Sequence, residues 1–337
     1  MASFLKKKNV TLSPKVYFVD AFGAMAMGLF ASLLIATIFG TIYDYSKIDF
    51  FLKMKEFGYG AQGCAMAVAI GFSLKAPSLV LLSLCAVGFG ATTVGAGAPF
   101  LAYVASLAAC EAGKLVSKTT KLDIVITPTV TIAVGTAIII WLGAPVSSAV
   151  TAFGKFIMDC TELQPFTMGI LVSVLIGIAL TLPISSAAIC ASIGLVGLAG
   201  GAATAGCCAQ MVGFAVMSYR ENGLGGLIAQ GLGTSMLQMG NITRKPIIWL
   251  PPTIASAITG PVATCVFKMT NAVPVASGMG TCGLVGPIGV LSGGLDNFGI
   301  IGLILICFVL PCIITLAISE TFRKLGWIKQ GDLKLDL

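Results

Sequence analysis

The 337-residue sequence contains no histidine, and charged residues make up only 10% of it. A soluble domain carries roughly 25% charged residues because its surface has to stay hydrated. The scarcity of charge therefore excludes soluble enzymes, nucleic-acid-binding domains and disordered scaffolds. The absence of histidine excludes histidine metal ligands, histidine general bases and a phosphohistidine carrier within this chain.

Motifs for metals, cofactors and ATP are missing as well. None of the 11 cysteines stands in a C-x-x-C pattern, and most of them lie inside apolar runs, as is typical of soft side chains packed between helices. No Walker A pattern occurs. GMGTCG at 278–283 matches the dinucleotide pattern G-x-G-x-x-G, but it lacks the preceding strand that this motif requires. We expect no metal, no cofactor and no catalytic machinery in this chain.

Apolar residues and glycine are abundant instead. Hydrophobic residues form 57% of the chain, the mean hydropathy is +1.01, and there are 41 glycines. Glycine lets membrane helices pack closely and breaks helices around a binding site. The composition predicts an all-α, multi-pass membrane protein with one transmembrane domain over residues 1–330 and a short cytoplasmic tail over 320–337.

About ten apolar segments are expected to be transmembrane helices. Some of them are too short for the roughly 20 residues of a straight crossing, so we expect tilted or broken helices. Two stretches rich in Gly, Pro, Ser and Thr, 145–158 and 274–291, predict re-entrant hairpins, and 223–241 predicts a helical insertion. The ten segments are 17–42, 60–74, 77–90, 92–112, 124–142, 167–182, 184–199, 202–218, 247–267 and 299–319.

Lysine and arginine are distributed unevenly between the two sides of this ten-span arrangement. The side opposite to the termini holds five of the 20, and the other fifteen lie on the side of both termini. Cytoplasmic loops carry the excess of Lys and Arg. We therefore expect both termini to be cytoplasmic. The five are Lys47, Lys53, Lys55, Lys155 and Lys268.

The sequence predicts an internal repeat, the alternative being that apolar stretches of limited composition match by chance. Copy A covers about 60–165 and copy B about 166–298, flanked by the helices at 17–42 and 299–319. Three proline-anchored blocks recur in order, with the extra length of copy B explained by the Gly-rich insertion at 221–241. The pairs are IGFSLKAP (70–77) with IGIALTLP (176–183), PTVTIAVG (128–135) with PTIASAIT (252–259), and PVSSAVTAFG (145–154) with PVASGMGTCG (274–283). If each copy has an even number of membrane spans, the two copies are parallel. If each copy has an odd number of spans, the two copies are inverted.

Duplicated halves with broken helices are how secondary transporters place a solute site at the repeat interface. Polar residues near membrane depth are the candidates for that site. The hairpin ends supply Glu162 and Gln164 in copy A and Asp296 and Asn297 in copy B. Carboxylates and amides suit a neutral, hydroxylated solute, since they exchange hydrogen bonds with hydroxyl groups. The alternative is that these residues lie in solvated loops and cap helices.

A second polar cluster follows the insertion. Asn241, Thr243 and Arg244 stand in GNITRKP at 240–246. Arg244 is a candidate for binding an anionic group, for pairing with Glu221, or for an ordinary positive-inside anchor.

Three blocks carry a family resemblance that covers roughly residues 10–325. They resemble bacterial membrane proteins classed with enzyme IIC of the sugar phosphotransferase system, a group that includes toxin regulators of the PfoR type. Glucose-type members have a G-I-T-E motif whose glutamate contacts the sugar, whereas this chain has Arg244 in that place. The blocks are QPFTMGILVSVLIGIALTLPISSAAI (164–189), GLAGGAATAGCCAQMVGFAV (197–216) and GNITRKPIIWLPPTIASAITGPV (240–262).

The resemblance implies a sugar permease subunit in the bacterial cell membrane. Separate IIA and IIB proteins would phosphorylate the solute and dock on basic cytoplasmic loops near Lys114–Lys121 and Arg244–Lys245. A homodimer embedded in lipid is also implied. Two alternatives stay open: a membrane sensor or regulator that binds a ligand without moving it, and an ion-coupled carrier of a non-sugar metabolite that uses Glu162 or Asp296.

Overall fold

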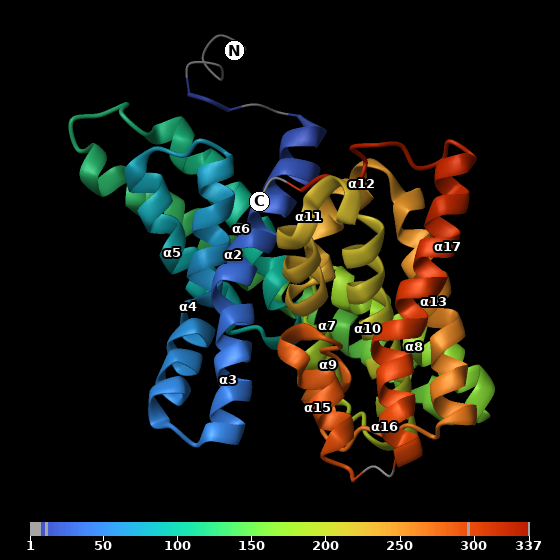
Figure 1. The fold of residues 1–337 in the computed structure, drawn as a ribbon. Coiled ribbons are helices and arrows are strands. Elements are labelled where there is room, and N and C mark those ends of the chain that lie inside the picture. The colour runs from blue at the N-terminus through green and yellow to red at the C-terminus, as the bar shows by residue number, and fades with distance from the viewer. Residues whose placement is uncertain (1–7, 11–12, 295–296, 336–337) are drawn as a thin grey trace.

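The computed structural model describes residues 8–10, 13–294 and 297–335, and this part of the chain is helical without a named strand. Figure 1 shows a bundle of helices that run mostly along one direction. Six helices in the described part are long and apolar enough to cross a membrane, so the predicted membrane class is consistent with the fold. The predicted count of ten spans is not confirmed. The six are Val16–Ser46, Ala98–Val116, Asp123–Thr161, Gly197–Met217, Pro246–Val266 and Asn297–Lys324.

The N-terminal part packs four helices and one 3₁₀ turn around one core. The first helix, Val16–Ser46, consists of the π-turns η1 (Val16–Asp20) and η2 (Phe30–Leu34) together with α2 (Ala21–Leu29) and α3 (Ile35–Ser46). It is followed by α4 (Asp49–Ser73), α5 (Ser78–Thr92), the 3₁₀ turn η3 (Gly95–Gly97) and α6 (Ala98–Val116). Their shared core contains the buried Met25, Met66, Leu84 and Leu101.

The helix α7 (Asp123–Thr161) has 39 residues and corrects one prediction. Residues 145–158 were expected to form a re-entrant hairpin, but they continue α7 without a break. Pro128 and Pro145 both lie inside the helix. In an apolar environment a proline removes one backbone hydrogen bond, whereas a hairpin would leave many backbone groups without partners. The helix is therefore the better solution for this stretch.

Three helices of the C-terminal part meet at small residues. They are α8 (Pro165–Thr181), α10 (Gly197–Met217) and α13 (Leu250–Pro261). The Ser173 hydroxyl of α8 donates to the Ser256 carbonyl of α13 at 2.8 Å, and the Ser256 hydroxyl donates to the Gly206 carbonyl of α10 at 3.2 Å. A Cβ atom on Gly206 would lie 2.7 Å from the Ser173 Cα atom. Small residues let the three backbones approach this closely.

Short helices connect α10 to α13, in the region where a helical insertion was predicted at 223–241. The segment contains α11 (Tyr219–Ile228), the π-turn η4 (Ala229–Gly233), the 3₁₀ turn η5 (Ser235–Gln238), α12 (Met239–Arg244) and the 3₁₀ turn η6 (Pro246–Trp249). It bends at Gly223, whose φ of 58° favours glycine. After α13, the π-turn η7 (Val262–Val266) completes the long helix.

The second predicted hairpin, 274–291, is interrupted in the structure. It consists of α14 (Pro274–Ser277), the 3₁₀ turn η8 (Cys282–Leu284) and α15 (Val285–Leu291), with α14 packed on α15. Its re-entrant position in a membrane stays a prediction. The last helix consists of α16 (Asn297–Ile304), η9 (Leu305–Val309) and α17 (Leu310–Lys324). The predicted span at 184–199 is wrong, because α9 (Ser186–Ser192) ends before α10 begins at Gly197.

Candidate functional site

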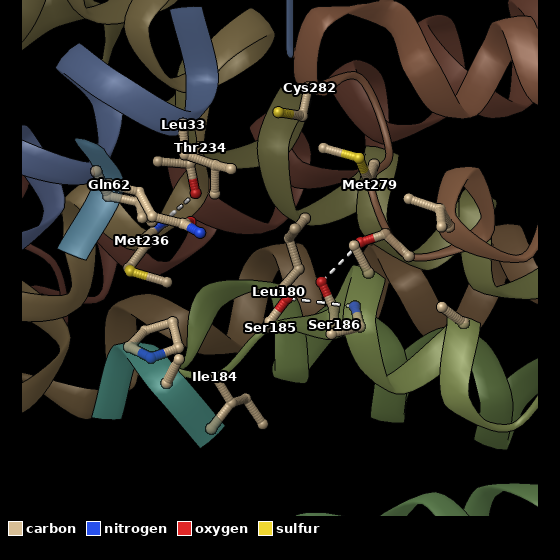
Figure 2. Close-up of a pocket in the computed structure, with 18 of the residues that line it drawn as sticks. Leu33, Gln62, Leu180, Ile184, Ser185, Ser186, Thr234, Met236, Met279 and Cys282 are labelled. Atoms are coloured by element: carbon tan, nitrogen blue, oxygen red, sulfur yellow. Dashed lines mark hydrogen bonds between the residues drawn. The ribbon is translucent and has the colours of Figure 1, made fainter. Parts of the chain in front are cut away.

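A cavity of about 370 Å³ lies between the N-terminal and C-terminal parts of the bundle. Figure 2 shows its lining, to which the first helix, α4, the α8–α9 turn, the η4–η5 segment and the α14–η8 turn all contribute. The cavity therefore lies where several helices are interrupted. Such interruptions bring backbone and polar side chains to the middle of membrane transporters.

Local sequence explains three of these interruptions. Pro183 follows the last turn of α8, and its missing N–H prevents the helix from continuing. Gly95 has a φ of 81° in the turn between α5 and α6. Gly280 has a φ of 54°, and a Cβ atom there would lie 2.7 Å from the backbone of Cys207. Both glycines are needed for their turns.

Most hydroxyl groups of the lining already have protein partners. Ser186 donates to the Gly278 carbonyl at 2.6 Å, which joins the α8–α9 turn to the α14–η8 turn. Ser185 accepts from an amide of its own helix, and Thr234 accepts from the Met236 amide at 3.2 Å (Figure 2). These bonds fix the shape of the cavity wall.

Gln62 of α4 is different, because its carboxamide has no hydrogen-bond partner among the described residues. It lines the cavity together with Tyr59 of the same helix. Figure 2 shows the Gln62 side chain near Thr234 and Met236. A carboxamide offers two donors and an acceptor to a ligand. None of the described lining residues is Asp, Glu, Lys or Arg, so the cavity is suited to a neutral ligand.

A buried polar network supports the cavity from behind. The Gln210 carbonyl oxygen accepts from the Trp249 indole at 3.0 Å and from the Thr181 hydroxyl at 3.3 Å. Thr181 also shares a hydrogen bond with Ser235 at 2.7 Å. Thr181 follows Leu180 of the lining, and Ser235 lies between Thr234 and Met236. The network therefore connects α8, α10 and the η5 turn directly behind the cavity wall.

Six of the seven residues expected to bind solute are described by the structure, and none of these six belongs to this lining. Glu162 and Gln164 are exposed at the turn between α7 and α8, and Asn297 is exposed at the start of α16. Both places are next to the far end of α13: Thr264 donates to the Pro165 carbonyl at 2.8 Å, and the Phe267 and Phe298 rings stack with centroids 4.9 Å apart. Asp296 lies outside the described residues.

The other three expected residues belong to α12, near the start of α13. Asn241 donates to the Gln238 side chain at 2.8 Å, and Thr243 donates to the Phe18 carbonyl at 2.6 Å. Arg244 lies 3.9 Å from Asp332. Glu221, considered as a partner of Arg244, is instead paired with Arg323 at 3.1 Å. The structure thus divides the six described residues between the two ends of the bundle, three at each end.

Sequence reasoning did not find Gln62 or the Ser185–Ser186 pair. The signal for the serines was present, since Pro183 separates two short apolar segments and a broken helix was expected there. The sequence alone does not identify Gln62 as a binding residue. A polar residue at the start of an apolar segment is equally compatible with a position at the membrane interface.

Comparison with known proteins places the chain in a family. A family model described as "Phosphotransferase system, EIIC" matches residues 19–335, which is nearly the whole chain. No curated protein and no solved structure matches the chain.

Proposed function

Since this chain belongs to the phosphotransferase system EIIC family, we propose that it is a sugar-permease-like subunit of a bacterial membrane that binds a small neutral polar solute in the central cavity. The observation that supports the proposal is the unpartnered Gln62 carboxamide in a cavity without described charged residues. A neutral lining accepts an uncharged solute without leaving a buried charge unpaired.

The proposed site agrees with the predicted repeat. Gln62, Thr92 and Pro99 of copy A line the cavity together with Leu180 and Met279 of copy B. A site between two copies is the arrangement of many secondary transporters. We also propose that both termini are cytoplasmic, because the Lys- and Arg-rich loops lie on their side.

Lys114 does not belong to the predicted docking surface for IIA and IIB proteins. Lys114 is only 1% exposed and donates to Glu111 and to the Leu74 carbonyl, both at 3.0 Å. It is therefore a structural residue and not part of a docking surface. Lys118 and Lys121 in the loop between α6 and α7 are exposed and remain candidates for contact with a partner.

The experiment compares the binding of a solute panel to two glutamine variants. The purified protein is heated with methyl glycosides, free sugars, polyols, sugar phosphates and carboxylates, and stabilisation is recorded. A ligand at 100 times its Kd adds about 2.7 kcal/mol to the free energy of unfolding. Gln62→Leu is expected to weaken binding about fivefold, the value of one hydrogen bond of about 1 kcal/mol. Gln164→Leu, the same change at an exposed turn, is expected to leave binding unchanged.

If Gln164→Leu weakens binding and Gln62→Leu does not, the site lies at the turn between α7 and α8, and the cavity proposal is contradicted. If no neutral solute stabilises the protein and anionic ones do, the proposed solute class is wrong. Uptake by liposomes that contain the protein separates a permease from a sensor, because a sensor binds the solute without moving it.

A further inference from the structure

The last described residues, 325–335, lie across the end of the bundle that carries α11 and α12 (Figure 1). The tail is packed like a core element. Leu333 is 0% exposed and Ile328 is 2% exposed, and both belong to the same cluster as Phe214 and Ile242. The cluster fixes the tail against the segment between α10 and α13.

Three carboxamide side chains of that segment bind the backbone of the tail. Asn222 donates to the Leu333 carbonyl and accepts from the Leu335 amide, both at 2.8 Å. Gln238 donates to the same Leu333 carbonyl at 3.0 Å, and Asn241 donates to the Lys334 carbonyl at 2.9 Å. The tail is thus held through its main-chain carbonyl and amide groups by side chains of the neighbouring segment.

A charged contact adds to these bonds. Asp332 of the tail lies 2.6 Å from the Lys245 ammonium group, which follows α12. The same carboxylate accepts from the Lys329 amide at 2.6 Å, which closes a turn within the tail. The Asp332 side chain is 14% exposed, so the pair is shielded from water more than a surface salt bridge.

One helical turn separates the tail from the cavity. Gln238 is the last residue of η5, and Met236 in the same turn lines the cavity together with the preceding Thr234. Gln238 also donates to the Gln230 side chain at 2.9 Å. The tail therefore holds one end of a four-residue turn whose other end forms part of the cavity wall.

We propose that residues 328–335 are a positioning element for the central cavity. By binding Gln238 and Asn222, the tail keeps η5 in the place where Thr234 and Met236 complete the wall. Release of the tail frees η5 and opens the cavity on that side. The inference concerns the shape of the cavity and does not depend on which solute binds there.

The test uses the full chain and two neighbouring tail residues. Leu333→Ala removes the buried anchor, whereas Lys334→Ala is the matched control, because the Lys334 side chain is exposed and has no partner among the described residues. Hydrogen–deuterium exchange is measured for peptides over 229–238. Alkylation of Cys282, a cavity-lining thiol that is 7% exposed, is measured with N-ethylmaleimide by peptide mass spectrometry.

Leu333→Ala is expected to accelerate hydrogen–deuterium exchange over 229–238 and Cys282 alkylation at least tenfold. In Lys334→Ala both rates are expected to equal those of the unchanged protein. Asn222→Ala removes two backbone contacts without touching the core, and it replaces Leu333→Ala if that variant does not fold. Exchange peptides from α5 are expected to stay unchanged. Faster exchange over 229–238 with an unchanged Cys282 rate overturns the proposal, since the tail would then stabilise its own segment without setting the cavity. Unchanged exchange also overturns it.

Discussion

Replacement of Gly206 by alanine tests whether the crossing of α8 and α10 depends on the absence of a side chain. The new Cβ atom would lie 2.5 Å from the Ser173 carbonyl carbon and 2.7 Å from its Cα atom, whereas ordinary contacts begin at 3.4 Å. The neighbouring atoms are backbone, so no rotamer change relieves the overlap. The helices would have to separate by about 1 Å, which loosens contacts along their length.

The expected loss is about 1–3 kcal/mol in the free energy of unfolding, the usual range for an overpacked core. The control is Gly23→Ala in α2, because a Cβ atom there meets nothing within 4 Å. That change is expected to stabilise the protein by about 0.5–1 kcal/mol, since alanine has the better helix propensity. The two alanine variants should thus shift stability in opposite directions.

The assay is thermal unfolding followed with a thiol-reactive fluorophore. Cys207 and Cys208 are both buried beside Gly206, so they react when α10 separates from its neighbours. At an unfolding entropy of about 2.1 cal/mol/K per residue, 1 kcal/mol corresponds to about 1.4 °C in a chain of 337 residues. Gly206→Ala should melt several degrees below the unchanged protein. If it melts at or above the temperature of Gly23→Ala, the close approach of the two backbones is not what the crossing requires.

Three further predictions, two of them with a control substitution, concern charged groups at the end of the bundle that carries the tail. Glu221→Gln is expected to lower the free energy of unfolding by about 2 kcal/mol, because its Arg323 partner is mostly buried. Glu320→Gln should cost less than about 1 kcal/mol in the same thermal-unfolding assay, because Glu320 pairs with the exposed Arg220 and has only a 3.9 Å contact with Arg323. Lys114→Met leaves Glu111 without its partner and should lower the free energy of unfolding by about 2 kcal/mol or more. Lys118→Met changes an exposed position and should have no measurable effect in the same assay. Partial burial acts to raise the pKa of Asp332, but Lys245, the Lys329 amide and Arg244 together hold it below its ordinary value of 3.8. Its contribution to tail docking is therefore present above pH 3.8 and is lost as the pH falls below that value, and exchange of tail amides with and without Asp332→Asn checks the sign.

The sequence alone predicts the class of the fold well, because composition decides it. An apolar chain with few charges must bury its backbone in helices, and the long segments at 17–42, 247–267 and 299–319 all lie in helices of the structure. Broken helices were also foreseen at Pro183 and in 274–291.

The positions of the polar residues were harder to predict. Residues 145–154 and 274–283 are aligned in the predicted repeat, yet the first stretch is continuous helix and the second, with three glycines against one, is broken after α14. Positive φ angles at Gly280 and Gly283 make the difference, and they are imposed by close packing on residues distant in sequence. Gln62 likewise becomes a candidate only when the elements around it are assembled. The local sequence pattern therefore did not predict these features, because they depend on contacts between residues that are far apart in the chain.

The length of α7 has a consequence for the surrounding lipid. A helix of 39 residues extends about 58 Å at 1.5 Å per residue, nearly twice a hydrocarbon core of about 30 Å. A straight helix of that length would need a tilt of roughly 60° to remain immersed, well beyond the usual limit of about 40°. Part of α7 therefore bends, lies along the headgroup region or extends into water. The uncharged stretch 124–154, about 46 Å long, still exceeds the hydrocarbon core, and this hydrophobic mismatch is expected to thicken a short-chain bilayer around the protein.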